Sequence, residues 1–340
     1  MSVLTFKSEE YETFPQVLKD YASYVNVIKG NSEKTVCEYL LDLRTFFRFY
    51  IMKGRGEQLS GKDFEKIDIS KITVADAGAV TPSLILEFLM YASFERENTP
   101  STRMRKLSAL KSLYHYLYGK KRLVDSNPTT EIDSPKKNQT LPKYMNTDEA
   151  IKLLETVNSD VESKTRLRDF AIIALFLNTG MRLSELVGLN IKSFDQELTS
   201  VKVKGKGNKE RIVYLNDISK SALRDYLEVR NDPTTLVEDT DALFISRLGK
   251  RISTKTVQWL VYKYLDMAGL GAKGLSTHKL RHTAATLMYQ SGNVDIRVLK
   301  DILGHEQLNT TQIYTHVVDR NIENAVKQNP LANLKIKKQD

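Results

Sequence analysis

The first third of the chain places apolar residues at the spacing of amphipathic helices. In the stretch 32–51, Val36, Leu40, Leu43 and Phe47 fall on one helical face. A second stretch, 102–119, repeats the pattern and ends at a glycine. Its apolar positions are Met104, Leu107, Leu110, Tyr114 and Leu117. This part of the chain is therefore predicted to be helical.

Beyond residue 150 the pattern changes. Apolar residues fill 165–180 almost continuously up to Gly180, which predicts a buried helix. In 198–215 they alternate with polar residues around a glycine-rich turn, which predicts a β-hairpin. The alternation puts three lysines on one face: Lys202, Lys204 and Lys206. Helical spacing then returns, so the sequence predicts a mainly α fold with a small antiparallel β-sheet in its C-terminal domain.

A polar segment separates the two patterns. Residues 125–150 hold three of the eight prolines and few apolar residues, and proline biases its neighbour toward extended backbone. We predict a helical domain over 1–130, an interdomain linker over 131–144 and a second domain over 145–340. The pattern assigns no role to residues 52–80.

Composition narrows the class of protein. The formal net charge of +9 favours a polyanionic partner such as DNA, RNA or a membrane surface. A single cysteine, Cys37, excludes an internal disulfide and suits a reducing cytoplasm. The N-terminal residues lack the pattern of a signal peptide, and the longest apolar run, 171–177, is too short to span a bilayer. We expect a cytoplasmic protein that is not bound to a membrane.

The stretch 275–290 gathers cationic residues and two of the chain's five histidines. His278, Arg281 and His282 lie at positions i, i+3 and i+4 of a predicted helix and share one face. The apolar side of this helix carries Leu280, Ala284, Leu287 and Met288. The polar face is therefore predicted to point away from the core.

The same helix is predicted to begin at His278, with Ser276 or Thr277 as its cap, and to end at Gly292. Three interpretations of its polar face remain open. Two histidines one turn apart can bind zinc, but the lysine and arginine beside them oppose a divalent cation. An arginine fork with a histidine donor can bind a phosphate. A solvated helix face is the third interpretation.

Other segments carry matching chemistry. Arg182 follows the glycine that ends the buried helix, Glu185 stands three residues later, and Lys206 lies on the hairpin turn. His305 follows a Leu-Gly pair, and Tyr314 stands nine residues beyond it. In this order, Thr-Gly-x-Arg-x-x-Glu-Leu, His-x-x-Arg, Leu-Gly-His and the tyrosine resemble the catalytic domain of the tyrosine recombinases, the Xer and phage-integrase family. The helical first domain resembles the family's core-binding (SAM-like) domain.

The resemblance implies a role for each residue. The implied catalytic residues are Arg182, Lys206, His278, Arg281, His305 and Tyr314. The tyrosine would be the nucleophile and the lysine the general acid on the leaving 5′ oxygen. The arginines would clamp the scissile phosphate, the histidines would serve as hydrogen-bonding and acid/base partners, and Glu185 would orient an arginine. His282 is expected to be structural.

The resemblance also implies the partners. Two guanidiniums can stabilise a phosphate under attack, and the sequence shows no acidic cluster spaced for two metal ions, so no metal and no cofactor is expected. The two domains would form a C-shaped clamp on a double-stranded DNA recombination site. Four protomers would assemble there, as a homotetramer or as a heterotetramer with a second recombinase. The basic residues that would contact DNA phosphates, or form a solvated face, are Arg103, Arg105, Lys106, Lys202 and Lys204.

Several functions share this pattern. The resemblance favours a Xer-like site-specific recombinase that cuts and rejoins DNA through a 3′-phosphotyrosyl intermediate and a Holliday junction. An integrase or excisionase of a phage or conjugative transposon is the alternative within the family. A non-catalytic DNA-binding protein on the same fold has no need of the tyrosine. A type IB topoisomerase shares the chemistry but relaxes DNA without a specific site.

Overall fold

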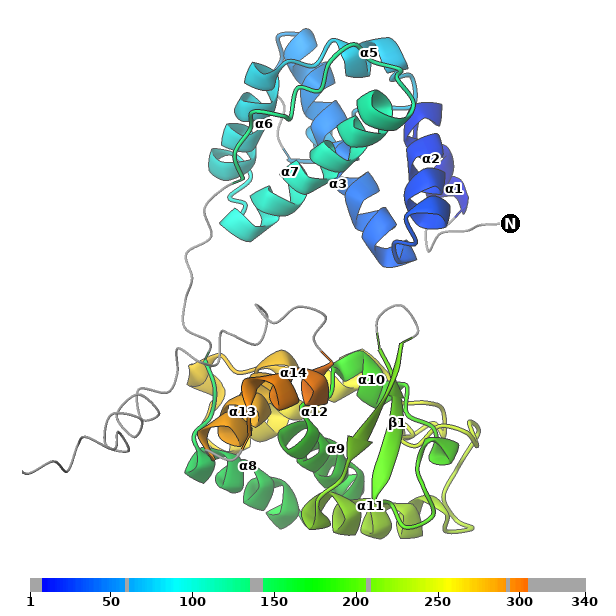
Figure 1. Ribbon diagram of the computed structural model, residues 1–340, viewed down its shortest axis with the longest axis vertical. Helices are drawn as coiled ribbons and strands as arrows, with labels where there is room; N and C mark the ends of the chain where they lie inside the picture. Colours follow the sequence, from blue (N-terminus) through cyan, green and yellow to red (C-terminus); the bar gives the residue numbers. More distant parts are fainter. Residues whose placement is uncertain (1–7, 59–60, 135–142, 206–208, 292–293, 305–340) are drawn as a thin grey trace, which may run out of the picture. The chain divides into compact units, whose positions relative to one another are not determined.

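The chain folds into two compact units, residues 1–139 and 140–340 (Figure 1). The computed structural model describes residues 8–58, 61–134, 143–205, 209–291 and 294–304. Each unit has its own apolar core. The predicted fold class, mainly α with a small antiparallel sheet, is confirmed. Over the described ranges no helix is both long and apolar enough to cross a membrane.

The first unit is built of helices around α3 (Glu33–Gly54), which packs against α2, α6 and α7. The other elements are α1 (Ser8–Glu12), α2 (Gln16–Ser23), the π-helix η1 (Tyr24–Ile28), α4 (Gly61–Glu65), α5 (Val74–Gly78), α6 (Pro82–Phe94), α7 (Pro100–Tyr114) and the π-helix η2 (His115–Lys120). The predicted apolar face of α3 is fully buried. Helices α6 and α7 each begin with a threonine cap followed by proline, a favoured helix start.

Residues 52–80 contribute to the core of the first unit. Phe64 in α4 and Ala77 in α5 are buried there, as are Ile67 and Ile69 between them. Their burial gives this stretch a packing role that the pattern did not assign.

The predicted boundary of the first domain at residue 130 is too early. Ile132 is buried in the core of the first unit and so belongs to that unit. On the other side, Met145 is fully buried in the core of the second unit.

The second unit is organised around the buried helix α9 (Arg166–Thr179), which contacts α8, α11 and α13. The other elements are α8 (Thr147–Ser159), α10 (Leu183–Val187), the 3-10 helix η3 (Ile191–Ser193), β1 (Ser200–Lys204), β2 (Glu210–Tyr214), α11 (Asp217–Arg230), α12 (Thr254–Met267), the 3-10 helix η5 (Gly271–Lys273), α13 (Thr277–Gln290) and α14 (Ile296–Leu303). As predicted, α9 ends at Gly180, whose φ of 60° lies in the left-handed region.

The predicted hairpin is also confirmed. Strands β1 and β2 pair antiparallel, in the register that places Lys204 opposite Glu210 and Val203 opposite Arg211. Val201 and Val203 are buried, and Lys202 and Lys204, which follow them, face solvent. The period-two pattern therefore specified both the strands and their faces.

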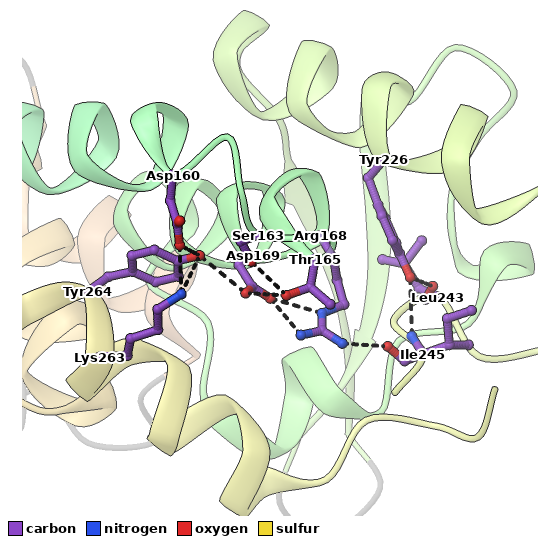
Figure 2. A network of polar contacts seen from close by, with 10 residues as sticks. All are labelled: Asp160, Ser163, Thr165, Arg168, Asp169, Tyr226, Leu243, Ile245, Lys263 and Tyr264. Carbon is purple, nitrogen blue, oxygen red and sulfur yellow. Dashed lines mark hydrogen bonds and ion pairs between the residues drawn. The ribbon is translucent and has the colours of Figure 1, made fainter. Parts of the chain in front are cut away.

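A buried polar network holds the N-terminal half of α9 against its neighbours (Figure 2). The Asp169 carboxylate accepts hydrogen bonds from Arg168 Nε (2.9 Å) and Nη2 (2.7 Å), while Arg168 Nη1 donates to the Ile245 carbonyl (3.0 Å). Tyr264 of α12 donates to Asp160 (3.1 Å) at the end of α8. These paired polar groups hold the first turn of α9 in place. The other end of α9, at Gly180, leads to the candidate site.

Candidate active site

Arg182 occupies the N-cap of α10, two residues after the left-handed turn that ends α9. Glu185, one turn into α10, accepts a hydrogen bond from the Arg182 backbone N–H (2.8 Å) and another from its Nη1 (2.9 Å). The Glu185 side chain is 1% exposed, whereas that of Arg182 is 36% exposed. The predicted orienting role of Glu185 toward this arginine therefore has a direct geometric basis.

Arg281 corrects the prediction that the polar face of α13 points away from the core. Its side chain is buried, with 3% of the residue exposed. Its Nη1 donates to the Gly180 carbonyl (2.7 Å) and its Nη2 to the Leu303 carbonyl (2.7 Å). A guanidinium has five N–H donors and no acceptor, so it is buried at lower cost where backbone carbonyls accept from it, as these two do. Arg281 therefore joins the end of α9 to the end of α14.

The bounds of α13 also differ slightly from the prediction. The helix begins at Thr277 and ends at Gln290, one residue before Ser291, instead of running from His278 to Gly292. Ser276 is its N-cap residue but makes no capping hydrogen bond through its side chain. The helical assignment itself is confirmed.

His278 is exposed at the start of α13, and the ring of His282 packs edge-on against it with centroids 4.5 Å apart. Desolvation by the surrounding protein, together with the charges of Arg281 and Arg182, lowers the pKa of His278 below its ordinary value. Burial, then the charges of His278, Arg281 and Lys279, lowers the pKa of His282 to about 4. Both imidazoles are thus neutral at pH 7, and a neutral imidazole has one N–H donor.

The arginines meet at the C-terminal end of α14. Arg182 Nη2 donates to the Gly304 carbonyl (3.1 Å), next to the Leu303 carbonyl that accepts from Arg281. A helix end carries carbonyls without intrahelical partners and a partial negative charge, so it attracts guanidiniums. The structure therefore brings Arg182 and Arg281, about a hundred residues apart in sequence, to one point directly before residue 305.

Arg211 is a site residue that the sequence interpretation missed. Its guanidinium makes a two-point ion pair with Glu185, with Nη1–Oε1 at 2.7 Å and Nη2–Oε2 at 2.9 Å. Its Nε donates to the Ile302 carbonyl (3.2 Å). A signal was present in the sequence: alternation along β2 puts Arg211 on the same face as buried Val213. A charged residue on the inner face of a strand needs a buried partner.

Burial of the Glu185 carboxyl raises its pKa, but hydrogen bonds from Arg211 and Arg182 outweigh burial and hold the pKa below the ordinary value. Glu185 is therefore ionised at pH 7. Its negative charge is shared between two guanidiniums, so Glu185, Arg182 and Arg211 together carry a net positive charge. Arg281 adds a further positive charge at the same place.

The remaining predicted catalytic residues, Lys206, His305 and Tyr314, lie outside the described residues. The strand that leads to the hairpin turn is described. Lys202 and Lys204 are exposed on it and flank Glu210, at 2.6 and 3.7 Å. DNA phosphates would have to compete with this carboxylate for the two lysines.

The predicted basic face of α7 is only partly available. Lys106 is buried, with 7% of the residue exposed, and its ammonium is paired with Asp42 at 3.0 Å. A phosphate contact by Lys106 is therefore not supported, because its charge is already used within the core. Arg105 reaches the same carboxylate at 2.5 Å but keeps its side chain 38% exposed. Arg103 donates to Ser93 Oγ (2.8 Å).

Comparison with known proteins agrees with this geometry. The model of the phage integrase family matches residues 143–321. A protein described as tyrosine recombinase XerC, from Caldanaerobacter subterraneus, is 44% identical over 94% of this chain and 88% of its own length. Another tyrosine recombinase XerC, from Thermodesulfovibrio yellowstonii, is 35% identical over 93% of this chain and 96% of its own length.

Solved structures show the same likeness. The pre-cleavage complex of the XerH site-specific recombinase with its difH substrate is 25% identical, with a TM-score of 0.65 over 92% of this chain and 83% of the other. A lambda integrase dimer bound to a core site shares the fold, with a TM-score of 0.61 at 17% identity over 86% of this chain and 95% of the other. A helical unit with arginines converging on one helix end thus defines the catalytic domain of a DNA strand-transfer enzyme, and the chain belongs to the phage integrase family. Within that family it is a Xer-like tyrosine recombinase.

Proposed function

We propose that this enzyme cuts and rejoins duplex DNA at a specific site by transferring a phosphodiester to Tyr314. The observation that carries the proposal is the convergence of Arg182 and Arg281 on the end of α14, directly before residue 305. Attack on a phosphodiester builds negative charge on the non-bridging oxygens. Guanidiniums already held by fixed carbonyls can stabilise that charge without reorganising.

The proposed reaction balances without an energy source. The Tyr314 hydroxyl gives its proton to a histidine of the site or to water as its oxygen attacks phosphorus, and the bond from phosphorus to the 5′ oxygen breaks. Lys206 gives a proton to that departing oxygen. The product is a 3′-phosphotyrosyl ester, which keeps the energy of the original bond. Attack by a free 5′ hydroxyl on this ester rejoins the strand.

His278 and His305 complete the proposed site. A neutral His278, at the first turn of α13 and within the field of both arginines, is suited to donate a hydrogen bond to a phosphate oxygen. His305 follows Gly304, whose carbonyl is bound by Arg182. Glu185 is proposed to orient Arg182 and not to touch the substrate.

The partners are proposed from the same likeness. XerH is described in complex with its difH substrate, before and after cleavage. We propose that this chain binds a double-stranded recombination site with both of its units, with Arg103, Arg105, Lys202 and Lys204 on the phosphate backbone. Four protomers would exchange strands in pairs through a Holliday junction, as a homotetramer or together with a second recombinase. A cytoplasmic location is proposed.

The test is Tyr314→Phe. The variant is expected to bind DNA with wild-type affinity but to form no covalent adduct, because the ring lacks the attacking oxygen. A suicide substrate with a nick near the cleavage point traps the wild-type adduct, which is visible as a protein–DNA band after denaturing electrophoresis. The binding site is first obtained by selection from random DNA. An adduct in the Phe variant would show that another residue is the nucleophile.

A further inference from the structure

The C-terminal end of α14, a helix of only eight residues, accepts several hydrogen bonds from side chains of other elements. Among the described residues, three successive carbonyls each accept a hydrogen bond from an arginine of a different element. Ile302 accepts from Arg211 of β2 (3.2 Å), and the carbonyls of residues 303 and 304 accept from Arg281 and Arg182, as described above. The arginine that lies deepest in this arrangement after Arg281 is Arg211, at 16% side-chain exposure.

Arg211 also closes the space around Gly304. A methyl group at Gly304 would lie 3.1 Å from Arg211 Cδ and 3.2 Å from its Nε. Gly304 has a φ of 63°, which favours glycine. The side chain of Arg211 is therefore packed directly on the backbone from which the chain continues to His305 and Tyr314.

The charge of Arg211 matters as much as its contacts. Glu185 carries a full negative charge at 1% exposure, and it touches both Arg182 and Arg211. With Arg182 alone, the carboxylate would cancel the charge of the guanidinium offered to the substrate. With Arg211 also present, the three residues keep a net positive charge. A phosphate that becomes more negative during attack is stabilised by that excess.

From this geometry we propose that Arg211 is a positioning residue for strand cleavage. It neutralises Glu185 so that Arg182 presents its positive charge to the scissile phosphate, and it fixes the end of α14. The inference rests on the proposed phosphotyrosyl chemistry. Arg211 itself does not touch the substrate.

The first experiment compares the cleavage rate of Arg211→Gln with that of the wild type, in the full chain and on the suicide substrate. We expect the rate to fall about 10- to 100-fold, while half-site affinity stays within about threefold. Arg251→Gln is the matched control. Arg251 also donates to backbone carbonyls of the second unit, Val187 (3.1 Å) and Leu189 (2.9 Å), but does not reach Glu185 or α14. Equal rate losses in both variants would mean that Arg211 is merely structural.

The second experiment tests the charge argument. In the double variant Glu185→Gln, Arg211→Gln, one positive and one negative charge are removed together, so Arg182 keeps its net charge. We expect this double variant to cleave faster than Arg211→Gln by at least about fivefold. A structural role would make the two losses add. A double variant that is as slow as Arg211→Gln, or slower, overturns the proposal.

The double variant also provides a test in case Arg211→Gln misfolds. Arg211→Gln leaves a buried carboxylate with fewer partners, which destabilises the fold, whereas the double variant leaves no buried carboxylate there. If only the double variant folds, near-wild-type cleavage supports the proposal and a loss above about 100-fold overturns it. Each rate is measured from the accumulation of total covalent protein–DNA adduct with time. Failure of the proposed chemistry would appear separately, as adduct that persists in Tyr314→Phe.

Discussion

At the scale of single residues, the departing 5′ oxygen requires a proton donor. An alkoxide is strongly basic and needs a proton as the bond breaks, whereas a thiolate does not. Lys206 is expected to supply this proton. Lys206→Ala should therefore cleave ordinary DNA at least about 100-fold more slowly and recover on DNA with sulfur at the 5′ bridging position. Single-turnover cleavage of the two substrates measures the difference.

Lys202 and Lys204 are the matched controls for Lys206, because they precede it in the sequence by four and two residues and carry the same charge. Both are paired with Glu210. Lys202→Ala and Lys204→Ala should weaken DNA binding and reduce its salt dependence, by about one unit of log–log slope each, without rescue by sulfur. Rescue of either one, or no rescue of Lys206→Ala, would move the general-acid role elsewhere.

His282 gives a pH prediction for stability. Its pKa of about 4 in the folded protein lies below the ordinary 6.5, so between these values the unfolded chain binds a proton that the folded chain does not. Stability from this group is complete above pH 6.5 and is lost as the pH falls toward 4. Between pH 7.5 and pH 5, His282→Gln should lose roughly 1–2 kcal/mol less unfolding free energy than the wild type. Because part of the ring is in solvent, this figure is smaller than the full pKa shift would give.

The measurement for His282 is urea unfolding at pH 5 and pH 7.5. The single tryptophan, Trp259, lies in α12 and reports on the second unit. His278 has its pKa shifted in the same direction, so the variant should remove only part of the slope. A slope unchanged in His282→Gln would contradict the assigned shift.

The residues proposed to be catalytic could be picked out in the sequence, but the electrostatic setting of those that the structure describes could not. The spacing of His278 and Arg281 placed both on one helix, yet the burial of Arg281 depends on carbonyls of residues 180 and 303, which only the fold brings near. Arg211 shows the same limit. Strand alternation indicates that its side chain turns inward, but not that the buried acid it meets is Glu185, 26 residues earlier.

At the scale of elements, the glycine that ends α9 lies close to Leu303 at the end of α14. Gly180 ends α9 with a φ of 60°, and a methyl group there would lie 2.8 Å from Leu303 Cδ2. Gly180→Ala should therefore displace α14 and disturb the carbonyls that hold Arg281. We expect a loss of about 2–4 kcal/mol in unfolding free energy and a fall in cleavage rate.

Gly269→Ala separates the effect of backbone strain at Gly180 from the effect of contact with α14. Gly269 also has a positive φ, 71°, but a methyl group there meets only the end of Lys152 at 3.8 Å. Backbone strain alone should lower its unfolding free energy by about 1–2 kcal/mol and leave cleavage unchanged. Denaturation curves and cleavage rates of the two variants are compared directly. Equal losses would show that contact with α14 is unimportant.

The elements themselves could largely be predicted from the pattern. Helices α3, α7 and α9 and the hairpin follow from apolar spacing and end signals that act within a few residues. The errors lie where tertiary contact decides. Lys106 has the position of a surface cation, but Asp42 of α3 draws it into the core. Ile132 lies in a polar stretch and is nevertheless buried.

At the scale of the whole molecule, the chain consists of two cores joined by the segment around residues 133–144. The core residues of the first unit end at Ile132 and those of the second begin at Met145. Each unit can therefore hold its own fold if the connection is cut. If both units bind one DNA site, the connection acts by raising the effective concentration of the second unit after the first has bound.

Cutting the connection tests whether each unit folds independently and whether both contribute to DNA binding. A specific protease site inserted within 135–142 allows the purified full chain to be cleaved after folding. Both units should keep their secondary structure, because neither core loses a residue. Affinity for the recombination site should fall at least about 100-fold on cleavage, the loss expected when two linked contacts become independent. The uncleaved chain with the same insertion is the control. Circular dichroism and gel-shift titration before and after proteolysis give both results, and an unchanged affinity would mean that a single unit carries the DNA binding.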